Sequence, residues 1–357
     1  MTRRSTRTVH VGGLSIGGNA PIAIQSMTNR PAEDLAGTIA QIRSLAALGC
    51  EIVRIACPTE AATEVFRKAK AEGITTPLVA DIHFDYRIAL AAVRCGADKI
   101  RINPGNIGSP DRVRAVADAC RAAGVPIRIG VNGGSLEKEL LLKYGGPTPE
   151  ALAESALRQA EQLEDMGFSD IVISIKSSRV DNMIHACRLV AAQSDYPLHL
   201  GVTEAGTEYS GVIKNAMGIG ALLCDGIGDT LRVTLTADPA AEITAAKEIL
   251  RAAGRRQTGV NLISCPTCGR TKIDLIPLAE AYRKATEAMD TNGKTVTAAI
   301  MGCAVNGPGE AREADFGVAG GDGCAILFRK GEKVRRVEEA DILTVLLEET
   351  KRTLAES

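Results

Sequence analysis

The feature that most constrains this chain is an alternation of strand-like and helical segments over about its first 250 residues. Short runs rich in β-branched residues, typical of buried strands, recur eight times, at Ile22–Met27, Glu51–Ala56, Pro77–Ile82, Lys99–Asn103, Pro126–Val131, Asp170–Ile175, Leu198–Thr203 and Thr230–Leu235. Alanine-rich amphipathic stretches between them predict helices at Leu35–Leu48, Glu60–Ala71, Asp85–Val93, Pro110–Ala123, Pro149–Met166, Val180–Gln193 and Ala240–Ala253. Most strands are therefore expected to be followed by a helix.

A strand–helix unit repeated about eight times predicts an α/β fold built on a (β/α)8, TIM-type barrel. The segments LAALGCEIVRIACP, AAVRCGADKIRINPG and RAAGVPIRIGVNG support the repeat, because each joins a helix end, a glycine and a strand with an apolar–Arg–Ile centre. An open doubly wound sheet shares the alternation, but no glycine-rich dinucleotide fingerprint follows the first strand. A short hairpin at Thr8–Ile16, around Gly12 and Gly13, is expected to precede the barrel.

The pattern changes after a linker at Gly254–Gly259. Helical stretches at Leu275–Met289 and Val337–Leu354 enclose strand-like runs at Thr295–Met301, Asp315–Val318, Ala325–Arg329 and Lys333–Arg336. This pattern of helices and strands predicts an α+β domain, and its length of about a hundred residues is normal for a domain. We therefore expect two domains, a substrate-binding barrel over residues 1–254 and a metal-binding domain over residues 255–357.

Arginines recur at the centres of the barrel strands, as Arg54, Arg101 and Arg128, each between apolar neighbours. Since side chains alternate along a strand, the apolar neighbours face the helices and the arginines face the barrel interior, near the end that carries active sites in this fold. Lys176 and Arg232 stand at corresponding positions. Each cation could instead pair with a barrel carboxylate such as Asp81, Glu204 or Asp229. Five cations around one interior (the cation cage) nevertheless favour an anionic substrate, most simply a diphosphate.

Polar residues follow the same strands. Asn103, Asn132 and Thr203 could orient a ligand, although the commoner task of such residues is to satisfy turn backbone. Glu204 could transfer a proton or form a salt bridge. Asp81 and His83 are similarly placed and are weaker candidates, because a lone histidine is more often structural.

Three of the ten cysteines are candidate metal ligands. Cys265 and Cys268 form a Cys-x-x-Cys motif, which lets two sulfurs reach one metal from a single turn, and Cys303 lies in the glycine- and proline-rich loop MGCAVNGPGE. The other seven are expected to behave as small buried hydrophobic residues. Three thiolates with no obvious fourth ligand are typical of an iron–sulfur cluster with one unusual iron.

Other centres are compatible with these cysteines. A structural zinc site would need a fourth ligand such as Cys324, because the second domain has no histidine. A redox thiol pair is disfavoured because the motif does not begin a helix in a thioredoxin-like unit. In a cluster, Glu310 could reach one iron as a weak carboxylate ligand that a substrate oxygen could displace.

Composition excludes several classes of function. The net charge is −1 and there is no tryptophan, which argues against a nucleic-acid partner. No apolar run follows the basic N-terminus and none approaches the length of a membrane span, so we expect a cytoplasmic protein with reduced thiols. The alternatives that remain are a non-redox barrel enzyme for phosphorylated or pterin-like substrates with a zinc-stabilised tail, and a zinc-containing RNA-binding protein.

The motifs PIAIQSMTN, VADIHF, RINPGNIG, IRIGVNGGSL, GVTEAG, GIGDTLRVTL, SCPTCGR and MGCAVNGPGEA occur in this order. Together they resemble the 4-hydroxy-3-methylbut-2-enyl diphosphate synthase family (IspG/GcpE), in its compact two-domain bacterial form, over essentially the whole chain. The resemblance implies reductive ring opening of 2-C-methylerythritol 2,4-cyclodiphosphate in the methylerythritol phosphate route to isoprenoids. It also implies flavodoxin or ferredoxin as the electron donor.

The resemblance further implies a 4Fe–4S cluster held by Cys265, Cys268, Cys303 and Glu310, with Glu204 as the active-site acid. The substrate contacts that it implies are Arg54, Arg101, Arg128, Asn132, Lys176, Thr203, Arg232 and Thr234. Thr234 stands where relatives often have serine, and the hydroxyl is kept. Members of the family act as homodimers in which the cluster domain of one subunit covers the barrel of the other, which would suit a short linker.

Overall fold

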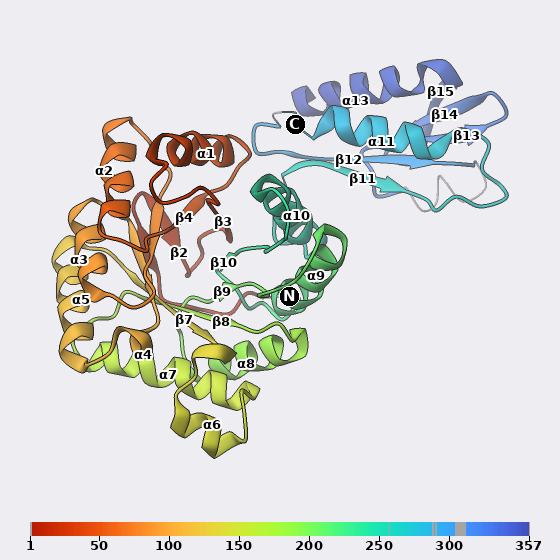
Figure 1. The fold of residues 1–357 in the computed structure, drawn as a ribbon. Coiled ribbons are helices and arrows are strands. Elements are labelled where there is room, and N and C mark those ends of the chain that lie inside the picture. Colours follow the sequence, from red (N-terminus) through yellow and green to blue (C-terminus); the bar gives the residue numbers. More distant parts are fainter. Residues whose placement is uncertain (1, 257, 288, 290, 304–311, 357) are drawn as a thin grey trace. The chain divides into compact units, whose positions relative to one another are not determined.

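The computed structural model describes residues 2–256, 258–287, 289, 291–303 and 312–356 (Figure 1). The chain divides into two compact units, Met1–Arg256 and Gln257–Ser357. The first unit extends slightly beyond the expected boundary at residue 254, because Arg256 Nη2 donates to the Ile22 carbonyl at 3.0 Å and pairs with Glu51 at 2.7 Å. Each unit is described by itself.

Eight parallel strands form the sheet of the first unit, in the order β8-β7-β6-β5-β4-β3-β10-β9. A bridge between Ile173 and Leu198 joins the two ends of this order, so the sheet curves into a nearly closed barrel. The predicted TIM-type barrel is confirmed, and the open doubly wound alternative is wrong. The strands are β3 (Ala23–Met27), β4 (Ile52–Ala56), β5 (Leu78–Asp81), β6 (Lys99–Ile102), β7 (Ile127–Asn132), β8 (Ile171–Lys176), β9 (His199–Leu200) and β10 (Thr230–Leu231).

The last two barrel strands are shorter than predicted. The β9–β10 ladder ends at Leu200 and Leu231. At Gly201, which follows β9, a Cβ would stand only 2.7 Å from the Arg232 carbonyl, so the backbones there are too close for a regular ladder of larger residues.

Helices surround the barrel strands (Figure 1). The main ones are α1 (Leu35–Ala47), α2 (Glu64–Ala71), α3 (Tyr86–Arg94), α5 (Pro110–Ala123), α7 (Pro149–Asp165), α8 (Val180–Gln193), α9 (Glu208–Cys224) and α10 (Pro239–Ala252), with α4 (Pro104–Ile107) and α6 (Lys138–Tyr144) as short additions. Thr148 caps α7 by accepting the Ala151 N–H at 3.2 Å, with Pro149 in the first turn. This start was expected from the sequence.

Helix α9 was not among the predicted helices, because its glycines lower helix propensity. Its packing explains them. A Cβ at Gly211 would stand 2.6 Å from Leu235 Cδ2, and one at Gly218 would stand 2.6 Å from Met183 Cε. The glycines therefore permit α9 to lie close to its neighbours.

The N-terminal hairpin, β1 (Val9–Val11) and β2 (Leu14–Ile16), was predicted and is present. Val11 and Ile16 pack against Ala23, Ile52 and Val79, at or near the starts of barrel strands. The hairpin thus closes the N-terminal end of the barrel, which leaves the C-terminal end for a site, as is usual for this fold.

The second unit is a five-stranded sheet in the order β11-β12-β13-β14-β15, with α11 (Leu275–Thr286) and α13 (Ile342–Glu356) packed on it. Its strands are β11 (Gly259–Ser264), β12 (Thr295–Met301), β13 (Phe316–Gly321), β14 (Cys324–Arg329) and β15 (Glu332–Glu338). Strands β11 to β13 are parallel, and β13 to β15 are antiparallel neighbours. The predicted α+β class is confirmed.

Two local predictions in this unit were wrong. The helix expected from Val337 begins at Ile342, because Val337 belongs to β15 and packs in the sheet core. Strand β11 starts at Gly259, inside the predicted linker, where pairing with β12 supplies the hydrogen bonds. Among the residues described, no helix has the length and apolarity needed to span a membrane.

Candidate functional site

Cationic side chains from neighbouring strands face the barrel interior. Arg54 lies on β4, Arg101 on β6 and Arg128 on β7, and the last two are paired in register. Their strand neighbours belong instead to the core between strands and helices, namely Val53, Ile55, Ile100, Ile102, Ile127 and Ile129. Because side chains alternate along a strand, the arginines point inward. Lys176 ends β8 and Arg232 follows β10, so the cation cage is drawn from five strands.

Asp81, at the end of β5, is a carboxylate that the cage shares. It lies 3.0 Å from Arg101 Nη1 and 3.5 Å from Arg54 Nε. His83 Nε2, on a half-exposed side chain, is 3.9 Å away. Burial opposes ionisation, but Arg54, Arg101 and Arg128 outweigh it and lower the pKa of Asp81 to about 2. Asp81 is therefore a charged counter-ion at neutral pH and not a proton acceptor.

Glu242, on α10, is the second counter-ion. Its carboxylate accepts from Arg232 Nε and Nη2, each at 3.1 Å, and from Ser26 Oγ at 2.9 Å. The thioether sulfur of Met27 accepts from Arg54 Nη2 at 3.0 Å and from Arg232 Nη1 at 3.4 Å. Arg54 and Arg232 are thus held together across β3.

Only one of the counter-ions suggested by the sequence is correct. Asp81 pairs with the cage as described. Asp229 precedes β10, where it pairs with Arg3 at 2.6 Å and accepts the Leu198 N–H at 2.7 Å. Glu204 is exposed and forms no salt bridge within the described part of the chain.

Arg128 and Lys176 have no carboxylate partner among the described residues. Arg128 is 1% exposed, and its Nε and Nη2 have no hydrogen-bond partner in the described part of the chain. Burial, followed by repulsion from Arg54 and Arg101, lowers the pKa of Arg128 well below its ordinary value. Burial and the surrounding arginines lower the pKa of Lys176 in the same way. The cage therefore holds more positive charge than its carboxylates balance, and a multiply charged anion would relieve the difference.

The two candidate asparagines lie together and serve turn backbone. Asn103 caps α4 by accepting the Gly105 N–H at 3.0 Å, and its Nδ2 donates to Ser135 Oγ at 2.8 Å. Asn132 Oδ1 accepts the Gly134 N–H at 3.1 Å and lies 3.0 Å from the same Ser135 hydroxyl. The structural role weighed for them is confirmed. Both remain at the strand ends, where a ligand contact was predicted.

The two candidate threonines lie on adjacent loops after β9 and β10. The Thr203 N–H donates to the Ser177 carbonyl at 3.3 Å. The Thr234 hydroxyl donates to the Val202 carbonyl at 2.6 Å, which leaves its oxygen free to accept. The Thr234 hydroxyl thus binds the residue before Thr203, so the two loops meet at the barrel end.

Glu204 follows Thr203 in the loop after β9 and is exposed. Its φ is 53°, the left-handed region that a residue with a side chain seldom adopts. Such a conformation costs on the order of 1 kcal/mol and persists where the surroundings impose it, often at functional sites. The strained backbone is in keeping with the proton-transfer role predicted for Glu204.

The predicted thiol ligands follow two adjacent parallel strands. Cys265 comes directly after β11 and Cys303 shortly after β12, and Ser264 pairs in register with Ile300. Cys265 Sγ accepts the Gly302 N–H at 3.1 Å. Since parallel strands end at one edge, the two loops meet there.

The turn that carries Cys268 joins the same edge. The Lys272 N–H donates to the Gly302 carbonyl at 2.8 Å, and the Cys268 N–H donates to Thr271 Oγ1 at 3.2 Å. Hydrogen bonds from Arg270 lower the pKa of the exposed Cys268 thiol, which favours the thiolate. An N–H directed at Cys265 sulfur and a stabilised thiolate at Cys268 fit a metal–sulfur group.

These thiols do not form a preassembled centre. Within the described residues, no three candidate ligands are close enough to hold a metal ion as placed. Glu310, the expected fourth ligand, lies outside the described residues.

The remaining cysteines separate by burial. Burial raises the pKa of Cys50, Cys57, Cys120 and Cys187 to about 12, so these are protonated thiols in the core, as expected. Cys95 is also buried. Cys224 is exposed and Cys324 is half-buried, so the expectation that all seven are buried was wrong for these two.

Sequence reasoning missed two charged residues of the interior. Glu242 lies on a helix, where no strand periodicity points to it. Lys99 is 0% exposed and stands two positions before Arg101 on β6, on the same strand face. The same side-chain alternation that places Arg101 in the interior also predicts that Lys99 faces inward.

Comparison with known families gives two matches that together span most of the chain. The GcpE TIM-barrel domain matches residues 6–247. The GcpE protein C-terminal domain matches residues 261–352. The two matches fall on the barrel and on the five-stranded sheet, respectively.

Curated relatives match over nearly their full length. One from Clostridium perfringens is 53% identical over 347 residues, which is 97% of this chain and 98% of the relative. Another from Geobacter sulfurreducens is 53% identical over 354 residues, covering 99% of both. Both are named 4-hydroxy-3-methylbut-2-en-1-yl diphosphate synthase (flavodoxin).

Solved structures of low identity support the fold alone. Dihydropteroate synthase from Stenotrophomonas maltophilia aligns with a TM-score of 0.51 and 15% identity, covering 70% of this chain and 98% of that one. The Thermus thermophilus enzyme aligns with a TM-score of 0.50 and 15% identity, over 69% and 98%.

Proposed function

This chain belongs to the GcpE family, and on that premise we propose that it is an iron–sulfur oxidoreductase that converts 2-C-methylerythritol 2,4-cyclodiphosphate to 4-hydroxy-3-methylbut-2-enyl diphosphate. This is a step of the methylerythritol phosphate route to isoprenoids. The ring C–O bond to the diphosphate opens, a hydroxyl leaves as water, and a pair of electrons is taken up. The observation that carries the proposal is the excess of buried positive charge in a barrel that matches these enzymes over its full length.

The barrel, residues 1–254, is the proposed substrate domain. Diphosphate oxygens would be the anionic partners of Arg128 and Lys176. Contacts with Asp81, Met27 and Glu242 already orient the other three cations of the cage, Arg54, Arg101 and Arg232. A pre-oriented guanidinium loses little side-chain entropy when it binds phosphate. Asn132, Thr203 and Thr234 would contact the ligand from the strand ends, with Asp81, His83 and Asn103 beside them.

The second unit, residues 255–357, is the proposed cluster domain. Cys265, Cys268, Cys303 and Glu310 would hold a 4Fe–4S cluster, which supplies the electrons for the bond cleavage when bound. The N–H of Gly302 supports this assignment, because it already stabilises negative charge on Cys265 sulfur.

Glu204 is the proposed proton donor for the departing hydroxyl. Its exposed carboxyl on a strained loop beside Thr203 supports the assignment. A general acid must lie within hydrogen-bond reach of the leaving oxygen, which the cage would fix by holding the diphosphate.

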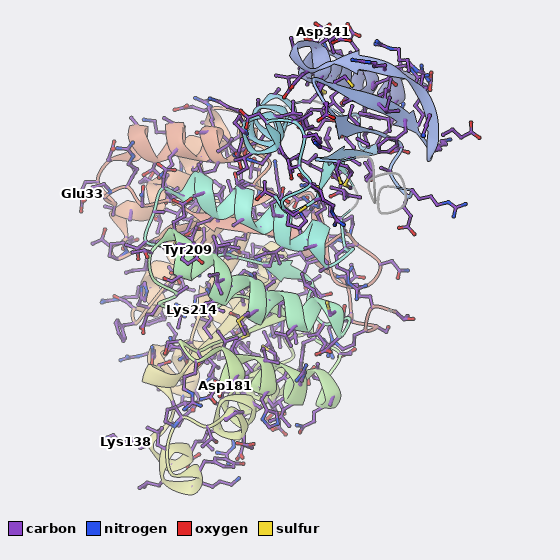
Figure 2. All side chains as sticks on the ribbon, turned by 90° about the vertical axis from the view of Figure 1, so that its right-hand side faces the viewer. Glu33, Lys138, Asp181, Tyr209, Lys214 and Asp341 are labelled. Carbon is purple, nitrogen blue, oxygen red and sulfur yellow. The ribbon has the colours of Figure 1, made fainter. Side chains whose placement is uncertain are left out.

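The proposed partners are an electron donor and a second copy of the chain. The relatives' names specify flavodoxin as the donor, and ferredoxin is a second possibility. A homodimer in which each cluster domain covers the partner's barrel is supported by an apolar strip on α9, where Tyr209, Ile213 and Met217 are 82%, 43% and 61% exposed. Figure 2 shows Tyr209 and Lys214 on the outer side of this helix. A groove of about 680 Å³ runs beside it, between α9 and α10.

Iron, sulfide and zinc content, measured with an absorption spectrum on protein purified without oxygen, tests the proposal. About four irons and four sulfides per chain and a broad band that bleaches on reduction are expected. Turnover of the cyclodiphosphate with reduced flavodoxin then tests the reaction. One zinc without sulfide, or a loaded cluster without turnover, would refute it.

A further inference from the structure

Lys99 lies deeper in the barrel than the cation cage. On β6 the side chains of Ile100 and Ile102 join the core between strands and helices, so Lys99 and Arg101 both face inward. Arg101 lies at the level of Asp81 and Arg128 in the sheet register, and Lys99 is one inward-facing position closer to the start of the strand. The side chain of Lys99 is fully buried.

The ammonium group of Lys99 is unpartnered. Its Nζ forms no hydrogen bond and no salt bridge with any of the residues described. Fully buried lysines are rare, and a buried charge without a partner destabilises a fold. Burial, then repulsion from Arg128 and from Arg54, lowers the pKa of Lys99 well below its ordinary value. Burial of this amine costs folding free energy, so packing alone does not explain why a lysine stands at this position.

Among the described residues, the interior around Lys99 contains other unpartnered polar atoms but no unengaged carboxylate. Arg128 on β7 and His199 on β9 are buried in the same interior, and Arg128 Nε, Arg128 Nη2 and His199 Nε2 also lack hydrogen-bond partners in the described part of the chain. The carboxylates nearest in the interior, Asp81 and Glu242, are already engaged with the arginines of the cage. Below the cage, the described residues therefore leave Lys99 without an acceptor for its amine.

We propose that Lys99 is a positioning residue for the diphosphate, acting through Arg128. This inference rests on the proposed function and names a residue of its site. Because Lys99 is fully buried below the level of Arg101 and Arg128, the proposal gives it no direct contact with the substrate. Its side chain lies one inward-facing position below Arg128, so it disfavours a retreat of that guanidinium into the interior. An anion bound at the cage would favour the protonated amine, which adds to the positive potential at the barrel end. The field is weakly screened because no solvent reaches it.

The proposed role and a purely structural role of Lys99 predict opposite changes in the unfolding temperature when the lysine is replaced. Lys99→Met keeps an unbranched side chain of similar length and removes the buried charge. The ligand-free variant is expected to unfold at a temperature about 3 °C higher or more, because a buried amine without a hydrogen-bond partner among the described residues is lost. Its affinity for inorganic pyrophosphate is expected to fall about tenfold, since one nearby cation no longer contributes. A lysine retained for packing would give a lower midpoint and an unchanged affinity.

The experiment compares wild-type protein, Lys99→Met and Lys68→Met, each as the full chain purified without oxygen. Lys68 is an exposed residue of α2, so it controls for the chemical change alone. Calorimetric titration with inorganic pyrophosphate gives the dissociation constants, and thermal unfolding with and without pyrophosphate gives the midpoints. Steady-state kinetics with the cyclodiphosphate should show KM raised about tenfold and kcat within about twofold of wild type.

Lys99→Gln, which is neutral but polar, provides the same comparison if the methionine variant does not fold. An unchanged pyrophosphate affinity in a folded neutral variant would overturn the proposal, and so would a fall in kcat with KM unchanged. Because pyrophosphate binding needs no turnover, a wild-type protein that fails to convert the cyclodiphosphate would refute the proposed function, while the affinities still decide the role of Lys99.

Discussion

Among single residues, Asp81 governs how much positive charge the barrel interior can hold without a ligand. It is 3% exposed and pairs with both Arg54 and Arg101. Removing one member of a buried ion pair leaves the other charge uncompensated, which costs more than the pair contributes. In the cation cage, Arg54 and Arg101 share Asp81, whereas Arg128 and Lys176 remain available for an anionic substrate.

Asp81→Asn is expected to destabilise the protein by about 3 kcal/mol, because Arg54 and Arg101 lose their shared anion. Urea denaturation followed by circular dichroism measures the loss. Asp181→Asn is the matched control, since Asp181 forms an exposed pair with Arg179 and its loss should cost less than about 1 kcal/mol (Figure 2). Equal losses in the two variants would contradict the shared-carboxylate assignment.

The stabilising effect of Asp81 should also depend on pH. Its pKa in the folded protein is lowered to about 2, against about 4 in an unfolded chain. A lowered folded pKa gives stability that is present above the unfolded value and is lost as pH falls through the folded value. The difference in unfolding free energy between wild type and Asp81→Asn should therefore shrink by about 2 kcal/mol between pH 5 and pH 2. A difference that stays constant over this range would count against the pairing.

At the scale of elements, the edge that carries Cys265 and Cys303 depends on close pairing of β12 with β13. A Cβ at Gly317 would stand 2.4 Å from the Ala299 carbonyl oxygen and 2.5 Å from Phe328 Cζ. The backbone oxygen of Ala299 cannot move aside as the end of a flexible side chain could. The small residue at this position therefore permits β12 to present its loop beside β11.

Gly317→Ala is expected to destabilise the second unit by about 2 kcal/mol and to lower the iron content of the purified protein, because β12 must shift. Gly220→Ala is the control. A Cβ at Gly220 meets nothing within 4 Å, and alanine in helix α9 should stabilise by up to about 1 kcal/mol. Thermal unfolding and iron analysis of both variants measure these effects. Normal iron content in Gly317→Ala would show that the pairing is not needed for ligand placement.

At the scale of the whole molecule, the proposed homodimer assigns the two halves of each active site to different chains. Arg128→Ala should impair only the barrel of its own chain, with the cluster spectrum intact. Cys265→Ser should impair only the cluster of its own chain. Each variant alone is expected to be inactive at substrate concentrations that saturate wild type, because every site contains one defect.

Mixing the two variants after partial dissociation should restore part of the activity, since some mixed dimers then combine an intact barrel with an intact cluster. Activity of the mixture, relative to the separate samples, measures this. Wild-type protein that is dissociated and reassociated in the same way gives the maximum activity that can be recovered. No recovery, with mixed dimers detected by mass spectrometry, would place both halves of a site on one chain.

The sequence by itself determined the features that depend on periodicity and spacing. Alternation along β4, β6 and β7 predicted that Arg54, Arg101 and Arg128 face inward, because the side-chain period of a strand is fixed. The strand–helix repeat predicted the barrel for a similar reason. The Cys-x-x-Cys spacing and the loop of Cys303 predicted that three thiols serve one metal centre. Cys265 and Cys303 follow adjacent strands in register, and the shared centre stays a prediction.

Only the tertiary structure decided which groups meet across the interior. Pairing of Arg232 with Glu242 joins a strand end to a helix, and the lack of a partner for Lys99 among the described residues appears only once the barrel strands are assembled. Helix α9 and strand β11 escaped prediction because close packing of glycines and pairing with β12 outweigh local propensity. Charge balance and close approach depend on distances between remote segments, and local sequence does not encode those distances.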